Sequence, residues 1–172
     1  MRRNIEIKAK ISDLTAITER VNAIADCGPT LIDHEDTFFR SSRGRLKLRK
    51  FSDSKGELIY YDRPDSIEPS ECRYIRSSIS APGEIIEILS RSIGIRGVVR
   101  KRRTIYVIGQ TRIHLDEVEG LGKFIELEVV LLPGQGATEG VRIARDLIDK
   151  LGILEPDLVD KAYIDLLNGG VG

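Results

Sequence analysis

Hydrophobic and charged residues alternate with a period of two along several segments, which predicts β-strands with one apolar and one polar face. The alternation is cleanest over residues 4–11 and 45–51, and residues 111–132 carry two alternating runs around a glycine-containing turn at 119–122. Further strands are expected at 31–40, 58–63, 71–79 and 98–108. With about eight strands, most of them adjacent in sequence, we predict an α+β fold built on an antiparallel sheet or barrel.

Other segments show the helical period of 3.6 instead. Helices are expected over residues 13–26, 82–93 and 138–151, with a shorter one over 157–167. Ser12 or Asp13, Pro82 and Thr138 supply the N-terminal signals of the longer helices. These helices follow the first, fifth and eighth strands, and no repeat or low-complexity tract interrupts the pattern. We therefore expect residues 1–172 to form a single domain.

The polar faces of the strands are charged, and the sign of the charge differs from strand to strand. Basic faces carry Lys8, then Arg45, Lys47 and Arg49, then Arg63, then Lys101 and Arg103, whereas acidic faces carry Asp116, Glu126 and Glu128. In one arrangement, usual for a half-buried sheet, these faces meet water. In the other, they line a lumen, helices cover the apolar outside, and a triphosphate with Mg²⁺ balances the charges. The alternation itself leaves both arrangements open.

Composition removes several classes of function. Lys and Arg total 27, as do Asp and Glu, so the net charge of zero speaks against nucleic-acid binding through bulk positive charge. Lacking a long apolar run, the chain is expected to have neither a membrane span nor a signal peptide. Cys27 and Cys72 lack a metal or redox spacing, which indicates reduced, buried thiols in a cytoplasmic protein. With only 2 histidines, any metal would be Mg²⁺ or Mn²⁺ on carboxylates.

Motifs along nearly the whole chain resemble the CYTH superfamily, which is named for class IV adenylyl cyclases and thiamine triphosphatases. Its members are also called triphosphate tunnel metalloenzymes. The matching segments, in order, are 4–8 (NIEIK, against the hallmark ExExK), 34–39 (HEDTFF) with 44–49 (GRLKLR), 61–64 (YDRP), 97–106 (GVVRKRRTIY), 113–116 (IHLD), 126–128 (ELE) and 160–163 (DKAY). One departure stands out, because Asn4 occupies the position of the first hallmark glutamate.

This resemblance implies an eight-stranded antiparallel barrel, flanked by helices and closed around a charged tunnel for a triphosphate and Mg²⁺ or Mn²⁺. Metal ligands would be Glu6, Glu126 and Glu128, with Asp116 close to a metal or its water. Phosphate contacts would come from the basic residues Lys8, Lys47, Arg49, Arg63, Lys101, Arg103 and Lys161, with Arg45 and Arg73 at the rim. Asp116, Lys8 and Lys161 would serve catalysis. Tyr163 would pack or hydrogen-bond near a tunnel end.

Three functions remain open at this stage. One is hydrolysis of tripolyphosphate, a nucleoside triphosphate or thiamine triphosphate by water at the terminal phosphorus. The second is cyclisation of ATP to cyclic AMP and pyrophosphate. The third is triphosphate binding without turnover, because Asn4 adds no charge to a metal site. Tryptophan is absent and no set of residues for reading adenine is evident, which favours hydrolysis. We expect a monomer or homodimer acting on a small-molecule triphosphate.

Overall fold

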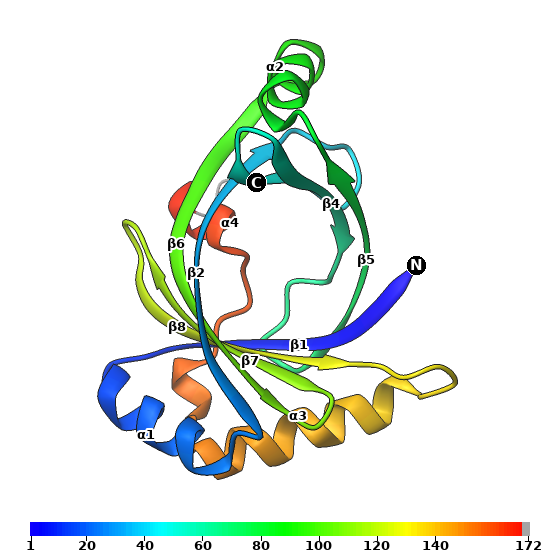
Figure 1. The fold of residues 1–172 in the computed structure, drawn as a ribbon. Coiled ribbons are helices and arrows are strands. Elements are labelled where there is room, and N and C mark those ends of the chain that lie inside the picture. The colour runs from blue at the N-terminus through cyan, green and yellow to red at the C-terminus, as the bar shows by residue number, and fades with distance from the viewer. Residues whose placement is uncertain (170–172) are drawn as a thin grey trace.

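Eight antiparallel strands close into a barrel in the computed structural model, which describes residues 1–169 (Figure 1). The strands are β1 (Arg2–Lys10), β2 (Cys27–Phe39), β3 (Arg45–Ser52), β4 (Lys55–Asp62), β5 (Ser70–Ile79), β6 (Ile95–Ile108), β7 (Thr111–Val118) and β8 (Gly122–Val130). Their order around the barrel is β1-β5-β4-β3-β2-β6-β7-β8, and β8 pairs again with β1. The predicted α+β fold with a closed antiparallel barrel is confirmed.

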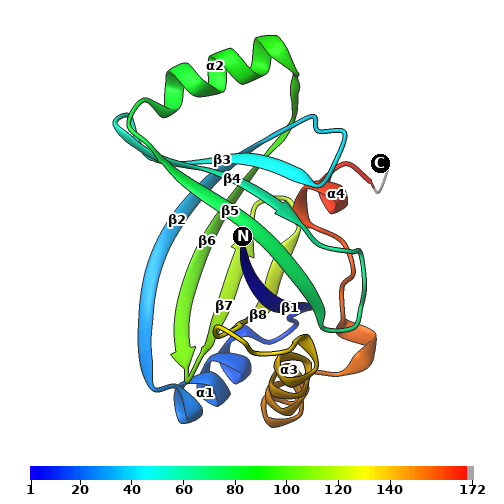
Figure 2. The ribbon, with the colours of Figure 1, turned by 90° about the vertical axis from the view of Figure 1, so that its right-hand side faces the viewer.

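The helices lie outside the barrel. They are α1 (Leu14–Ile24), α2 (Pro82–Ser92), α3 (Ala137–Leu151) and the short α4 (Tyr163–Leu167). Helices α1 and α3 lie together on the side formed by β1, β7 and β8, whereas α2 lies on the opposite side (Figure 1, Figure 2). Helix α1 begins after Asp13, whose carboxylate accepts a hydrogen bond from the Ala16 backbone N–H at 3.0 Å. The chain therefore places its helices after β1, β5 and β8, as predicted.

Two details of the predicted helices are wrong. Gly136, rather than Thr138, is the N-cap of α3, and no side chain caps that end. The helix expected over 157–167 is replaced by a 3₁₀ turn at Glu155–Asp157, a short extended stretch, and α4. The extended stretch runs alongside β1, where the Val159 N–H donates to the Lys8 carbonyl at 2.9 Å. This path carries the segment that ends in α4 across one end of the barrel.

The hydrophobic core lies between the barrel wall and helices α1 and α3. Ile7 and Leu127 from the strands pack there with Val21 and Leu151 from the helices, and all are buried. Successive side chains of a strand point to opposite faces. Because the apolar residues of β1, β7 and β8 face the helices, the charged residues between them point into the barrel. The arrangement with a charged lumen is therefore the one that the chain adopts.

Helix α3 can approach the barrel closely because it carries a glycine at the contact. A Cβ atom at Gly140 would lie 2.6 Å from Ile5 Cγ1 and 2.7 Å from Leu131 Cδ2, both closer than carbon atoms normally come. Ile5 is fully buried under this helix. The missing side chain of Gly140 thus fixes how α3 sits against β1.

Candidate active site

A cavity of about 350 Å³ occupies the lumen and is lined by side chains from all eight strands. Its basic lining residues are Lys8, Lys47, Arg49, Arg63, Arg76, Lys101, Arg103 and Arg112. Its acidic lining residues are Glu6, Asp36, Glu57, Glu126 and Glu128. The cations outnumber the carboxylates inside a chain of zero net charge. The lumen therefore has room and charge for a polyanion.

The glutamates of β1 and β8 lie side by side, since Glu6 is opposite Glu128 and Lys8 is opposite Glu126 in the strand register. Glu126 contacts Arg103 Nη2 and lies 3.4 Å from Lys8 Nζ. Burial, the largest single effect, raises the pKa of Glu126, but the charges of Arg103, Lys101 and Lys8 together outweigh it and hold the pKa well below its usual range. Glu126 is thus an ionised carboxylate already surrounded by cations.

Glu128 is held in a similar way by different partners. Its Oε1 accepts from Asn4 Nδ2, and its Oε2 accepts from Arg112 Nε at 2.7 Å. Glu6, in contrast, forms a single ion pair within residues 1–169, with Arg63 at the longer distance of 4.0 Å. Burial and the charge of Glu128 both raise the pKa of Glu6. Of the three glutamates predicted as metal ligands, Glu6 is therefore the one with uncompensated negative charge.

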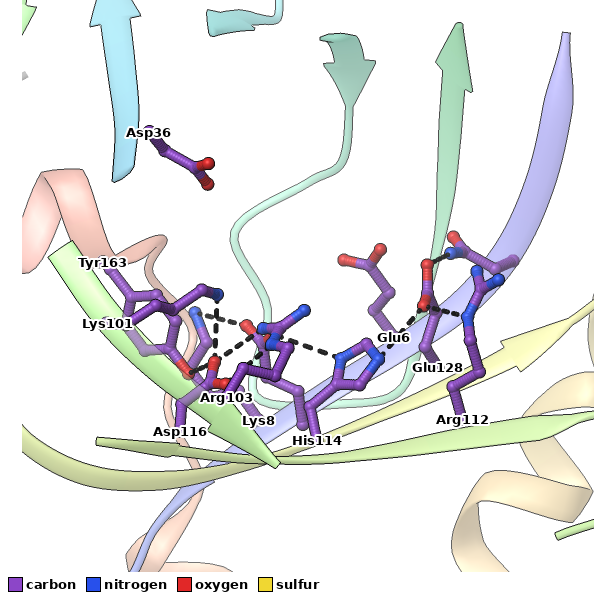
Figure 3. Close-up of polar contacts among 12 residues, drawn as sticks. Glu6, Lys8, Asp36, Lys101, Arg103, Arg112, His114, Asp116, Glu128 and Tyr163 are labelled. Atoms are coloured by element: carbon purple, nitrogen blue, oxygen red, sulfur yellow. Dashed lines mark hydrogen bonds and ion pairs between the residues drawn. The ribbon is translucent and has the colours of Figure 1, made fainter. Parts of the chain in front are cut away.

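The surroundings of Asp116 differ from those expected of a metal ligand. It is fully buried, and its oxygens accept from Lys101 Nζ at 3.0 Å, from Arg103 Nε at 2.7 Å and from Tyr163 Oη at 2.9 Å (Figure 3). It is not among the residues that line the cavity. Burial raises its pKa, but Arg103 and Lys101 lower it by more, so the carboxyl is ionised. A carboxylate so enclosed does not fit a metal ligand or a base that activates water. It orients the two cations.

Asp36 holds a second pair of cations and was not singled out in the sequence as a site residue. It is 2% exposed and accepts from Lys47 Nζ at 2.8 Å and from Arg49 Nε at 2.7 Å. Burial lowers the pKa of Lys47 to about 8, although Asp36 acts against that shift. In the sequence, Asp36 belongs to the segment 34–39 (HEDTFF) and shares the parity of His34 and Phe38, but neither feature marks it as a counter-ion of cations. All three side chains line the cavity.

The basic residues near α4 surround a separate recess of about 340 Å³ at the barrel end, lined among others by Arg45, Arg63 and Lys161. Arg45 pairs there with Asp165 at 2.8 Å. The Lys161 side chain lies in this recess and not in the central cavity, while its carbonyl accepts from Lys8 Nζ at 2.9 Å. Arg45 thus lines the recess at the barrel end. Lys161 lies at a mouth of the tunnel, which does not fit direct contact with the reacting phosphate.

One predicted phosphate contact lies outside the barrel. The Arg73 side chain is 63% exposed and pairs with Glu71 at 2.7 Å. Arg76, three residues further along β5, faces the cavity instead. Because the two arginines are three residues apart on one strand, they lie on opposite faces, but that spacing does not tell which of them faces inward. We correct the assignment accordingly, so that Arg76 and not Arg73 belongs to the lumen.

Both histidines face the lumen, although neither was a predicted site residue. His114 lies between Glu126 and Glu128, with one ring nitrogen 3.7 Å from each glutamate. Figure 3 shows the side that faces Glu128. Burial, followed by the charge of Arg103, lowers the pKa of His114. Its alternation with Ile113 and Leu115 was visible in the sequence, but a lone histidine carries no specific signal. Its position between two glutamates could be recognised only in the folded chain.

Comparison with known proteins identifies the family. The model of the CYTH domain matches residues 2–163. The chain belongs to the CYTH family. It is 24% identical over 169 residues to a putative adenylate cyclase of Methanocaldococcus jannaschii, covering 94% of this chain and 97% of that protein. It is 25% identical over 171 residues to the adenylate cyclase CyaB of Aeromonas hydrophila, covering 92% and 85%.

Solved structures share the fold. The PH1012 protein of Pyrococcus horikoshii superposes with a TM-score of 0.84 at 28% identity, covering 95% of this chain and 98% of that one. Within residues 1–169, no helix has the length and apolar character needed to cross a membrane. The domain match and the superposition on PH1012 each cover nearly all of the chain.

CYTH enzymes generally depend on a divalent metal, so we ask whether the residues that line the lumen could bind Mg²⁺ or Mn²⁺. Glu6, Glu126 and Glu128 offer the oxygen ligands that Mg²⁺ and Mn²⁺ prefer. A cation beside Glu6 would also relieve its repulsion with Glu128. In the described part of the chain, however, no three His, Cys, Asp or Glu side chains converge on one point. The donor chemistry fits the metal, and Glu126 and Glu128 would exchange contacts with neighbouring cations to bind it.

Proposed function

We propose that this CYTH protein is a divalent-metal-dependent triphosphatase that hydrolyses the terminal phosphoanhydride bond of a triphosphate. The observation that carries the proposal is the surplus of lysines and arginines over carboxylates in a closed lumen of about 350 Å³. A triphosphate supplies negative charge along a chain of three phosphates, and arginine and lysine are its usual partners.

The cations have assignable tasks. Two pairs of cations face one cavity from opposite sides of the β2–β6 pairing. One pair is Lys47 and Arg49, held by Asp36. The other pair is Lys101 and Arg103, held by Asp116. Being pinned by buried carboxylates, they need little reorganisation when the phosphates arrive. Such prearranged charges favour the transition state of phosphoryl transfer.

Lys8 is the best candidate for contact with the transferred phosphoryl group. Its Nζ is fixed by the Lys161 carbonyl at 2.9 Å and lies 4.0 Å from the centre of the Tyr163 ring. It is 3% exposed and stands beside Glu126. Mg²⁺ or Mn²⁺, held by Glu6, Glu126 and Glu128, would supply charge neutralisation and a lower pKa for the attacking water. Lys8 would then share the charge that develops on the terminal oxygens.

A product assay tests the proposal. The protein is incubated with tripolyphosphate and, separately, with ATP, under Mg²⁺ and then Mn²⁺, and the products are resolved. We expect orthophosphate from at least one substrate, and none in EDTA. Glu126→Gln should abolish turnover, while exposed Glu117→Gln is the matched control on the neighbouring strand and should retain it. Metal-independent release, or full activity of Glu126→Gln, would contradict the assignment.

Adenylyl cyclase activity is the second candidate, favoured by the names of the two relatives that match almost the whole chain. The same phosphate contacts would serve it, but the ribose 3′-hydroxyl would attack the α-phosphorus and pyrophosphate would leave. Cyclic AMP and pyrophosphate from ATP, without attack on tripolyphosphate, would establish this reaction instead. Tight binding of either compound with no product would indicate a binding module.

A further inference from the structure

The segment that crosses one end of the barrel brings an aromatic ring into the lumen. Tyr163, the first residue of α4, is buried and lines the central cavity (Figure 3). Its ring centre lies 4.0 Å from Lys8 Nζ and 4.8 Å from Lys101 Nζ. Both distances fall within the range of about 6 Å over which the face of an aromatic ring attracts an ammonium group. One ring therefore attracts two of the cations that we assign to the phosphates.

Two contacts hold this ring in place. Tyr163 Oη donates to Asp116 Oδ2 at 2.9 Å, and Lys101 Nζ donates to the same oxygen at 3.0 Å. The Phe124 ring packs against Tyr163 in a T-shaped pair, with centroids 5.0 Å apart. A hydroxyl bonded to a fully buried carboxylate, together with a ring packed on a second ring, leaves Tyr163 little freedom. The ring is thus a fixed surface on which the two lysines can be oriented.

The position of Lys8 indicates what this surface does. Its Nζ lies 3.4 Å from Glu126 Oε1, whereas a closed ion pair of this kind measures about 2.7–2.9 Å. The Tyr163 ring and the Lys161 carbonyl, which accepts from Nζ at 2.9 Å, compete with Glu126 for the same ammonium group. Closure of Lys8 onto Glu126 would occupy both the cation assigned to the phosphates and a carboxylate assigned to the metal. The ring therefore favours an open arrangement of the pair.

We propose that Tyr163 is a positioning residue of the phosphate site. Its ring holds the ammonium groups of Lys8 and Lys101 in the lumen and keeps Lys8 from closing onto Glu126. The proposal rests on the triphosphate function proposed above, and Tyr163 acts through the lysines rather than on the phosphates. Without the ring, the lysines would have to leave other partners or become ordered when a triphosphate arrives, and binding would weaken.

A tyrosine that only fills space would leave the lysines unaffected. Tyr163 does pack with Phe124 in a cluster of buried residues that also includes Phe38 and Val99. Packing of this kind depends on the shape of the ring, whereas attraction of a cation depends on the negative charge over the ring face. The two roles can therefore be separated by changing the electrons of the ring at nearly constant shape.

Fluorinated rings provide this test. Tyr163→Phe removes the hydroxyl and serves as the reference protein. Phenylalanine analogues with increasing numbers of ring fluorines, which weaken the negative charge over the ring face, are then introduced at position 163 by codon suppression. Tripolyphosphate affinity is measured by calorimetric titration in EDTA. We expect the affinity to fall stepwise with fluorination, and to lie about three- to thirtyfold below the reference for the fully fluorinated ring.

The same analogues at position 124 are the matched control. Phe124 packs on Tyr163 but is not among the residues that line the central cavity. Fluorination there changes the same buried cluster without changing the face that the lysines meet. Affinity for tripolyphosphate should differ by less than about twofold within the control series, and thermal unfolding of every protein shows whether the fold is retained.

Each failure has a distinct meaning. A constant affinity across the series at position 163, or an equal fall in both series, would mean that Tyr163 only packs, and the positioning role would be refuted while the triphosphate function stands. Loss of binding in Tyr163→Phe itself would assign the effect to the hydroxyl and also refute the role of the ring face. If wild-type protein does not bind tripolyphosphate in EDTA or with Mg²⁺, the proposed function fails and the positioning role fails with it.

Discussion

Replacing Asp116 by asparagine tests whether this residue orients cations or takes part in the chemistry. The substitution keeps the shape of the side chain but removes a charge that lies against Lys101 and Arg103 in a fully buried position. One oxygen of Asp116 accepts from Lys101, Arg103 and Tyr163 together, and an asparagine amide could not accept from all of them. At least one buried cation would lose its partner.

The expected cost follows from that geometry. Breaking a buried ion pair by removing one partner costs about 3–5 kcal/mol, a large share of a typical folding free energy of about 5–15 kcal/mol. For a chain of this size, that loss lowers Tm by about 6–20 °C. Thermal unfolding in EDTA, followed by circular dichroism, measures the effect without any metal. Tyr163→Phe removes one of the hydrogen bonds to Asp116, so it should cost about 0.5–3 kcal/mol.

The result separates two roles that an activity assay would merge. A catalytic or metal-binding carboxylate contributes little to the stability of metal-free protein, and its removal often leaves Tm unchanged. A carboxylate that neutralises two buried cations contributes to stability in every condition. If Asp116→Asn unfolds in EDTA at the same temperature as wild type, while exposed Glu117→Gln also shows no change, the assignment of Asp116 as a counter-ion is refuted.

Four further predictions concern the lumen and its support. Burial lowers the pKa of Lys47 and that of Lys8 to about 8, so both lose their protons above that pH in the free protein, whereas bound phosphate retains the protons. Tripolyphosphate affinity measured by calorimetry should therefore fall above pH 8 by up to about tenfold per pH unit for each lysine, and an equally steep fall in the double variant Lys8→Arg/Lys47→Arg would contradict this. Glu126→Gln should keep tripolyphosphate binding in EDTA while losing turnover, and loss of both would show that it mainly supports Arg103. Asn4→Glu should raise Mn²⁺ affinity in titrations without substrate, relative to Asn4→Gln, because it adds charge beside Glu128; equal affinities would remove position 4 from the metal site. Gly140→Ala should lower the free energy of unfolding in urea by about 1–3 kcal/mol through overpacking, and an unchanged midpoint would mean that α3 shifts freely.

Local sequence determined which residues of a strand share a face. The alternation over residues 45–51 and 98–108 correctly grouped Lys47 with Arg49 and Lys101 with Arg103, and the strand expected over 71–79 places Arg73 and Arg76 on opposite faces. The helices after β1, β5 and β8 were also evident, because a 3.6-residue apolar period and a capping residue such as Asp13 are properties of neighbouring residues. The order of short motifs then indicated the family.

Only the tertiary structure decided which face looks inward. Alternation has no direction, since an apolar face can form the interior of a barrel or the outside that helices cover. Packing of α1 and α3 on β1, β7 and β8 settled this, and the same closure turned Arg73 outward. The sequence also did not show which cations pair with the buried carboxylates. Asp36 and Asp116 contact cations that lie 11–15 residues away in sequence on a neighbouring strand, and strand register and barrel curvature determine those contacts. A charge pattern read along the chain identifies the groups that are available, and the closed barrel determines which of them neutralise one another and which remain free for a ligand.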